Sequence, residues 1–276
     1  MDAEKINDIL SMIDETLVLE FLETIVGLGP RVTGTYGCEK AAQYIHQEFQ
    51  DMGLIARYQN WRSWGNKYHH HIYNSQNIEG TLPGTNTTDS SAIIFNAHYD
   101  SVAKGPGAND DGSGVAAVLA IAKILSQYSF NYTIRFIAFS GEDVGLYGSY
   151  MYTRDASRRG DNIVAVIQID MIGFANTAEG RRTLCFNSPE QSKWIADFAT
   201  RVDTFYRNQT NLTIEINPSI FTDDHQSFVD HGFDGLFAVH YDWPDPCIIH
   251  RTIPLIDSIG YILRKQQNSY WSLLQN

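Results

Sequence analysis

The stretch SAIIFNAHYDSVAKGPGANDDGSGVAAVLAIAKILSQYSFNYTIRFIAFS, residues 91–140, indicates the fold class of this chain. It opens with the apolar run SAIIFNA and closes with the apolar run YTIRFIAFS, and between them lies a helical pattern, GSGVAAVLAIAKILSQY. Short, nearly continuous apolar runs are typical of strands that are covered on both faces, and a helix between two of them predicts a parallel β-α-β unit. The stretch therefore predicts an α/β protein.

The same alternation continues on both sides of this stretch. Further strand-like runs are IARYQNW (55–61), HIYNSQNIEGTL (71–82), NIVAVIQID (162–170) and GLFAVHYD (235–242). Helical periodicity occurs over residues 2–27, 38–52, 189–206, 223–232 and 253–265. We expect a three-layer α/β/α sandwich with a mixed, mostly parallel central sheet, in which the less regular strands before residue 98 form an antiparallel edge. No long linker interrupts the pattern, so residues 1–276 are expected to form a single domain.

Composition argues against several classes of protein. The formal net charge of −12 and the pI near 5.1 oppose binding to phosphate backbones and anionic lipid, so we expect no nucleic-acid partner and no membrane partner. No apolar run reaches the roughly 20 residues of a transmembrane helix, and MDAEKINDIL lacks the features of a signal peptide. A soluble protein is expected, whose compartment and oligomeric state stay open; export is implied if a signal segment was removed before Met1.

Side chains suited to metal binding follow the predicted strands at the points where the strands end. They are His98, Asp100, Asp110, Glu142, Asp143, Asp170 and His250. Ligands in open α/β sheets lie outside the carboxyl ends of the strands, so these side chains should meet at one edge of the sheet. Imidazoles and carboxylates suit zinc, one carboxylate can bridge two cations, and a spare carboxylate can accept the proton of a water molecule. The pattern predicts metal-assisted hydrolysis.

Five motifs in a fixed order resemble those of a known enzyme family. They are HYD (98–100), GANDDGSG (107–114), SGEDVGLYGS (140–149), IQIDMIG (167–173) and IH (249–250). Their order is similar to that in the co-catalytic zinc exopeptidases, the family-28 metallopeptidases and their clan, which includes secreted bacterial leucyl aminopeptidases, glutamate carboxypeptidase II and the glutaminyl cyclases. The resemblance implies that the single domain is a zinc peptidase catalytic domain.

The resemblance also implies a role for each of the seven residues. His98 and Asp170 match the ligands of one zinc ion, Asp143 and His250 match those of a second, and Asp110 matches the carboxylate that bridges them. Glu142 matches the general base, and Asp100 matches an acid that orients the ring of His98. The implied activity is that of an aminopeptidase that hydrolyses the N-terminal residue from peptides with a free N-terminus. Two zinc ions per chain are expected, with one as the alternative.

Two rival activities would use the same site: glutaminyl cyclisation, an acyl transfer that uses one zinc ion in relatives, and carboxypeptidase action. A non-catalytic binding domain is disfavoured because every ligand position is filled. The replacement of the Glu-Glu pair of many relatives by Glu142-Asp143 keeps a one-metal form open.

Several neighbouring residues have simpler interpretations. Asp111 is interpreted as a turn or helix-cap residue, and Asp223–His225 as part of the rim or outer support of the site, with helix capping as the alternative. His69–His71 are interpreted as surface or edge histidines, because alternate residues of a strand face opposite ways. Residues 105–107 are not expected to bind a nucleotide, because Asp110 stands where a phosphate loop requires a glycine.

Overall fold

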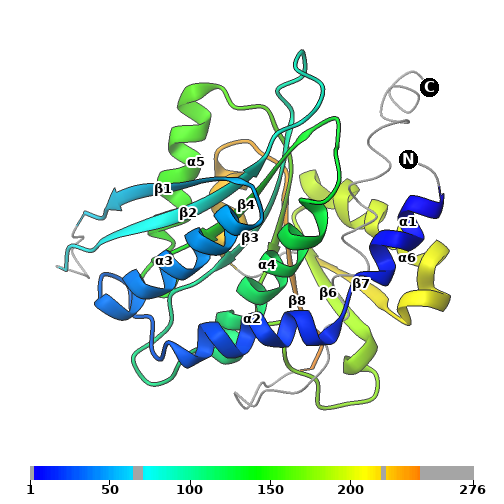
Figure 1. The fold of residues 1–276 in the computed structure, drawn as a ribbon, viewed down its shortest axis with the longest axis horizontal. Helices are drawn as coiled ribbons and strands as arrows, with labels where there is room; N and C mark the ends of the chain where they lie inside the picture. The colour runs from blue at the N-terminus through cyan, green and yellow to red at the C-terminus, as the bar shows by residue number, and fades with distance from the viewer. Residues whose placement is uncertain (1–2, 65–70, 219–221, 243–276) are drawn as a thin grey trace.

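A computed structural model of the chain describes residues 3–64, 71–218 and 222–242 (Figure 1). Within these residues, eight strands form one sheet in the order β1-β2-β4-β3-β5-β8-β6-β7. The strands are β1 (Ile55–Arg62), β2 (Asn74–Leu82), β3 (Ala92–His98), β4 (Thr133–Phe139), β5 (Ile163–Ile169), β6 (Thr183–Ser188), β7 (Thr213–Pro218) and β8 (Gly235–His240). The α-helices are α1 (Ala3–Ser11), α2 (Glu15–Gly27), α3 (Tyr36–Asp51), α4 (Gly114–Leu125), α5 (Tyr147–Arg159), α6 (Lys193–Thr210) and α7 (Asp224–Asp230). Shorter helical turns are Ala108–Ser113, Gly180–Arg182 and Glu190–Ser192.

The sheet is mixed, with a parallel centre. Strand β3 pairs in parallel with β4 and β5, and β5 pairs in parallel with β8. The pairs β1–β2 and β2–β4 are antiparallel, so the predicted antiparallel edge before residue 98 is confirmed. A third antiparallel pair, β6–β8, was not predicted. The predicted α/β class with a mixed central sheet is confirmed.

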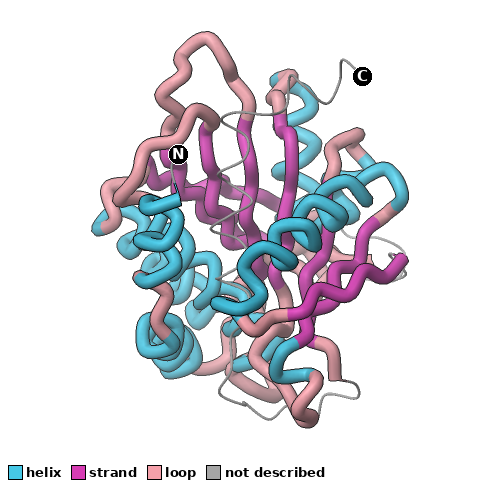
Figure 2. Tube along the Cα trace, turned by 90° about the vertical axis from the view of Figure 1, so that its right-hand side faces the viewer, coloured by secondary structure: helices cyan, strands magenta, loops and turns pink. Residues whose placement is uncertain are grey.

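Helices cover both faces of the sheet, and the alternation of side chains along β3 explains why (Figures 1 and 2). Ile93 and Phe95 belong to a core that also contains residues of α2, α3, α4 and α6. Ile94, between them in sequence, points to the opposite face and packs in a second core with residues of α5 and α7. Every residue of β3 is buried, as expected for a central strand with a helical layer on each side.

Helix α4 is apolar around most of its circumference. It packs against β3 on one side and against α2 and α3 on the other, and all of its residues except Lys123 are buried. A helix that is apolar all round is expected where a second layer of helix covers it. This packing fixes the start of α4, which immediately follows the turn Ala108–Ser113.

The helices and strands differ from the prediction in a few places. The periodic run over residues 2–27 forms two helices, because Asp14 caps α2 by accepting a hydrogen bond from the amide of Thr16 at 3.0 Å. Strands β6 and β7 and helix α5 were not predicted. The predicted helix over residues 253–265 lies outside the described residues. Every helix among the described residues is too short or too polar to span a lipid bilayer.

Candidate metal centre

The carboxyl ends of the central strands bring most of the predicted metal-binding residues together. His98 is the last residue of β3, Asp170 directly follows β5, and Glu142 comes three residues after the end of β4. Asp110 lies in the turn Ala108–Ser113 that leads into α4. His250 lies outside the described residues, as do His69 and His70, so the structure describes neither the expected second histidine ligand nor most of the histidine tract.

The imidazole of His98 is the centre of the cluster. Its Nε2 atom lies 3.0 Å from Asp110 Oδ1, 3.6 Å from Asp170 Oδ2 and 3.9 Å from Glu142 Oε2. Its Nδ1 atom lies 3.4 Å from Asp100 Oδ1, on the other side of the ring. The ring therefore presents one nitrogen to three carboxylates and the other to a single buried carboxylate, which is the arrangement of a metal ligand held by an outer acid.

Asp100 is anchored from two further directions. Its Oδ2 accepts a hydrogen bond from Thr33 Oγ1 at 2.6 Å, and its Oδ1 accepts a longer one from the amide of Glu142 at 3.4 Å. Asp100 is fully buried, so its contacts fix both the ring of His98 and the backbone that carries Glu142. Thr33 was not singled out in the sequence, where a threonine in a turn-rich segment gives no sign that it is buried.

Asp170 indicates that the cluster suits a cation. Its carboxylate is almost wholly buried, and its Oδ1 atom has no hydrogen-bond partner among the described residues. An unpaired buried carboxylate is costly, and a bound cation would remove that cost. His98, Asp111 and Asp170 each have a potential ligand atom within 4.8 Å of the others, and so do His98, Asp100 and Asp143. A set of imidazole nitrogen and carboxylate oxygens fits zinc.

The electrostatics of the site point the same way. Burial alone would lower the pKa of His98, but Asp170, Asp100 and Asp110 raise it well above its usual value. Burial and the nearby acids raise the pKa of Asp170 to about 7 and that of Glu142 to about 9. These acids cannot all ionise close together unless a positive charge is placed among them. A protonated imidazole or a metal ion would supply that charge.

Asp143 differs from the other acids because its side chain is exposed to solvent. Partial burial of the carboxylate and the charges of neighbouring acids, Asp100 first among them, nevertheless raise its pKa to about 6. Its carboxylate lies within 4.8 Å of candidate ligand atoms of His98 and Asp100. The structure therefore brings Asp143 to the cluster, on its solvent side.

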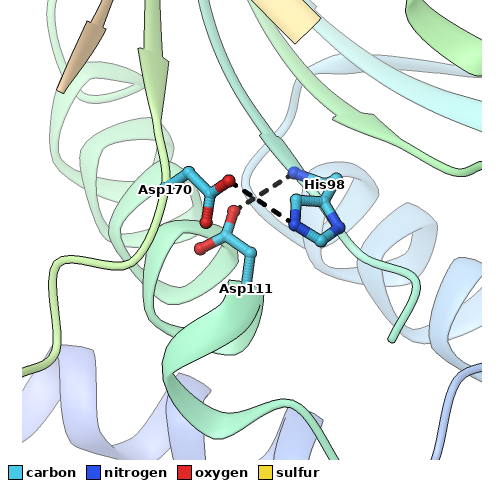
Figure 3. A group of neighbouring side chains, drawn as sticks. All are labelled: His98, Asp111 and Asp170. Atoms are coloured by element: carbon cyan, nitrogen blue, oxygen red, sulfur yellow. Dashed lines mark hydrogen bonds and ion pairs between the residues drawn. The ribbon is translucent and has the colours of Figure 1, made fainter. Parts of the chain in front are cut away.

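Asp111 does more than the turn or cap role expected from the sequence. It is fully buried, and Figure 3 shows its carboxylate beside His98 and Asp170. Its Oδ1 accepts hydrogen bonds from the amides of Gly114 at 2.8 Å and Met171 at 3.3 Å, and its Oδ2 accepts one from the amide of His98 at 3.2 Å. Asp111 thus ties together the end of β3, the start of α4 and the segment after β5. Asp110, whose side chain is 55% exposed, keeps its carboxylate available beside His98.

The segment Asp223–His225 lies near the cluster, at the start of α7. All three residues are buried, and the charges of Asp223 and Asp224 contribute to the raised pKa of Glu142. Asp223 also caps α7 by accepting a hydrogen bond from the amide of Asp224 at 2.6 Å. Both interpretations of this segment therefore apply: it supports the site electrostatically and it starts a helix.

Comparison with known proteins places the site in a family. The model of peptidase family M28 matches residues 77–261, which is about two-thirds of the chain. The chain belongs to peptidase family M28. The matched range contains all seven predicted site residues, and His250 lies near its end.

Relatives of this M28 chain include named peptidases. Aminopeptidase YwaD of Bacillus subtilis is 30% identical over 182 residues, which cover 62% of this chain and 36% of the relative. The chain spans between 36% and 65% of the length of the curated relatives that match most of it.

Solved structures share the fold. The aminopeptidase from Aneurinibacillus sp. strain AM-1 has a TM-score of 0.76 at 17% identity, over 95% of each chain. The glutaminyl cyclase of Porphyromonas gingivalis has a TM-score of 0.74 at 20% identity, over 91% of this chain and 96% of the other. The fold is thus common to aminopeptidases and cyclases, and the fold alone does not select between these two activities.

Proposed function

We propose that this M28 chain is a zinc-dependent aminopeptidase. The observation that carries the proposal is the position of His98, whose Nε2 faces Asp110, Asp170 and Glu142 within 3.9 Å at the carboxyl edge of the sheet. Sequence relatives that are named as aminopeptidases and zinc metalloproteases support the same activity. Peptides with a free N-terminus are the proposed substrates.

The proposed zinc ligands are His98, Asp110, Asp143, Asp170 and His250. Asp110 is suited to contact two ions, because its side chain is half exposed and its carboxylate lies at the open side of His98. When bound, zinc supplies Lewis acidity and lowers the pKa of a water molecule enough for attack at neutral pH. We propose two ions per chain, and one ion is the alternative.

Glu142 is the proposed general base. Its side chain is 20% exposed, so the carboxylate can reach solvent and substrate while its backbone amide is held by Asp100. In the metal-free site, burial, Asp223 and Asp224 favour the protonated form of Glu142, and the positive charge of bound zinc would favour the carboxylate form, which is the form that accepts a proton. It would take the proton of the attacking water at Oε2 and return it to the amine that leaves.

The acids around the site also favour a cationic substrate end. Asp223 and Asp224 add negative charge behind Glu142, and the chain as a whole carries a formal charge of −12. A negative site attracts the ammonium group of a free peptide N-terminus. A C-terminal carboxylate, which a carboxypeptidase must bind, would be repelled by the same acids.

The test compares Glu142→Gln with Glu23→Gln, a change at an exposed position of α2, on leucyl-anilide hydrolysis and zinc content. We expect Glu142→Gln to keep zinc and lose at least about 10²-fold in kcat, whereas Glu23→Gln keeps both. A chelator should abolish the wild-type activity. Cyclisation of a peptide with N-terminal glutamine, without amidolysis of any free-amine substrate, would overturn the aminopeptidase proposal. Elemental analysis counts the ions, near two or near one per chain.

A further inference from the structure

Arg31 is a fully buried arginine in the segment between α2 and α3. Its guanidinium donates hydrogen bonds to three backbone carbonyls: Nε to Tyr99 at 2.6 Å, Nη2 to Gly107 at 3.1 Å, and Nη1 to Pro106. The side chain of an arginine is a rigid fork of donors, so three acceptors in fixed positions hold it in one orientation. A buried cation that is used in this way requires an explanation beyond packing, because burying a charge is costly.

The three carbonyls lie at the two ends of one loop. Tyr99 stands between His98 and Asp100, whereas Pro106 and Gly107 lie a few residues before Asp110. Arg31 therefore ties the segment that carries the first histidine to the segment that carries Asp110. No other described residue makes hydrogen bonds from one side chain to both ends of this loop.

The carbonyl of Gly107 extends this contact to the turn beyond. It accepts a hydrogen bond from the amide of Gly112 at 2.9 Å in addition to that from Arg31. Asp110 and Asp111 lie between these two glycines, so the bond encloses both aspartates. Gly107 has a φ of 55°, and a Cβ there would collide with Ser101 and with the backbone of Asp110. The close approach of the loop to Arg31 therefore requires a glycine at this position.

The backbone around Arg31 adds further contacts to the same loop. The amide of Arg31 donates to Ser101 Oγ at 2.9 Å, and the amide of Ser101 donates to the carbonyl of Arg31 at 3.3 Å. Thr33, two residues on, donates to Asp100 at 2.6 Å. We name residues 31–33 the brace segment, since it contacts both ends of the loop 99–107, at residues 99–101 and at residues 106–107.

The charge of Arg31 also matters to the cluster. Asp111, Asp100 and Asp110 all attract the guanidinium electrostatically. Among the described residues no carboxylate forms a direct ion pair with Arg31, and its nitrogens are occupied by carbonyls. Arg31 thus reduces the repulsion between the acids without using the carboxylate oxygens that a metal needs.

We propose that Arg31 is a positioning residue of the metal centre, which holds the loop 99–107 so that the flanking residues His98 and Asp110 keep ligand geometry and Asp100 keeps its contact with the ring of His98. This inference rests on the proposed zinc site. A merely structural arginine would affect the stability of the fold and leave zinc affinity unchanged, whereas a positioning residue affects zinc affinity in chains that remain folded.

The experiment measures zinc affinity by competition with a chromophoric chelator, for wild type, Arg31→Lys and Arg135→Lys. Lysine keeps the charge but lacks the fork. Arg135 is the matched control: it is a mostly buried arginine of β4 that donates to Tyr152 at 3.1 Å and to Asp161 at 2.8 Å, away from the loop. We expect Arg31→Lys to raise the zinc Kd about 10–100-fold, as loss of an outer partner of a metal ligand typically does. Arg135→Lys should leave the Kd within about twofold of wild type.

A second measurement tests rescue. Arg31→Ala should bind zinc weakly, and millimolar guanidinium ion should restore part of the affinity, because the ion can refill the cavity and its hydrogen bonds. A folded Arg31→Lys protein with wild-type zinc affinity would overturn the proposal. If neither Arg31 variant folds, the pair Thr33→Val and Thr33→Ser decides: an unchanged Kd in Thr33→Val refutes the brace, and weakened binding that serine restores supports it. Wild type without zinc affinity would instead refute the proposed function.

Discussion

Replacement by asparagine should have opposite effects at the adjacent residues Asp110 and Asp111. At Asp111 it should mainly lower the stability of the fold, and at Asp110 it should mainly weaken zinc binding. Asp111 accepts backbone hydrogen bonds from Gly114 and Met171 on Oδ1 and from His98 on Oδ2, and it is fully buried. In Asp111→Asn the amide oxygen can replace only one carboxylate oxygen, and the amide nitrogen then faces an N–H donor. At least one buried backbone amide is left without an acceptor.

The magnitude follows from that count. One orphaned buried amide costs about 1–3 kcal/mol. Burial and the charge of Asp170 raise the pKa of Asp111 well above its usual value, so the substitution also relieves repulsion and the loss should lie near the middle of that range. We expect the free energy of unfolding to fall by about 2 kcal/mol, which for a chain of this size is a fall in Tm of about 3–4 °C. Asp110→Asn, at a half-exposed side chain, should change the stability by less than about 0.5 kcal/mol.

Zinc affinity should fall more in Asp110→Asn than in Asp111→Asn, which is the reverse of the order expected for stability. Asp110→Asn removes a proposed ligand and should weaken binding by more than the roughly 10–100-fold that the loss of an outer partner costs. The assay is thermal unfolding of the metal-free proteins together with chelator competition for zinc. If Asp111→Asn is as stable as wild type, the three backbone hydrogen bonds of Asp111 do not contribute as argued. If Asp110→Asn binds zinc as tightly as wild type, Asp110 is not a zinc ligand.

Two further predictions concern pH. Burial favours the neutral form of Glu79, but Arg57 and Tyr152, which donate to it at 2.8 and 2.6 Å, outweigh burial and lower its pKa. Ionised Glu79 therefore stabilises the folded state at pH values above the pKa of about 4.3 that the group has in the unfolded chain. This contribution is lost as the pH falls through the lower pKa of Glu79 in the folded state. Chemical denaturation should show Glu79→Gln less stable than wild type by about 1.5–3 kcal/mol at pH 7, with a smaller difference near pH 3; a constant difference would contradict this. Zinc binding should release protons and tighten from pH 6 to pH 8, because Asp170, with a pKa of about 7, must ionise; calorimetry in two buffers of different ionisation enthalpy measures the release, and binding independent of pH would refute it.

The central part of the fold could be predicted because its residues follow simple periodicities. Strand β3 is buried at every position, and α4 is apolar all round, so both stand out in the sequence. Helix α5 does not, because it buries small or polar side chains such as Gly148, Ser149 and Thr153. Strands β6 and β7, TLCFNS and TIEINP, carry polar residues among their six positions, so neither forms an apolar run like that of β8, which has the same length. Hydrophobic periodicity therefore detects elements that bury large apolar side chains and misses those that pack through small ones.

The sequence predicted which residues lie at the candidate site better than it predicted how their side chains are directed. The strand-end rule brings His98, Asp170 and Glu142 to one edge, and the structure has them there. Which of two adjacent aspartates faces the histidine ring and which binds backbone amides depends on the path of one turn. A sequence pattern does not encode that path. Arg31 was missed for a similar reason, since an arginine among prolines and glycines usually lies on the surface.

The guanidinium of Arg31 and the proposed zinc ion would have different tasks at this site. The guanidinium of Arg31 cannot lose its proton, and its hydrogen bonds go to the carbonyls of Tyr99, Pro106 and Gly107. It is therefore a permanent charge on the backbone side of the loop, and it leaves the carboxylate of Asp110 unobstructed. If Arg31 instead paired directly with Asp110, it would fill the position of an exchangeable ion and block zinc. A permanent cation behind the loop can lower the cost of assembling the acids, while the proposed zinc is left to bind at their open side.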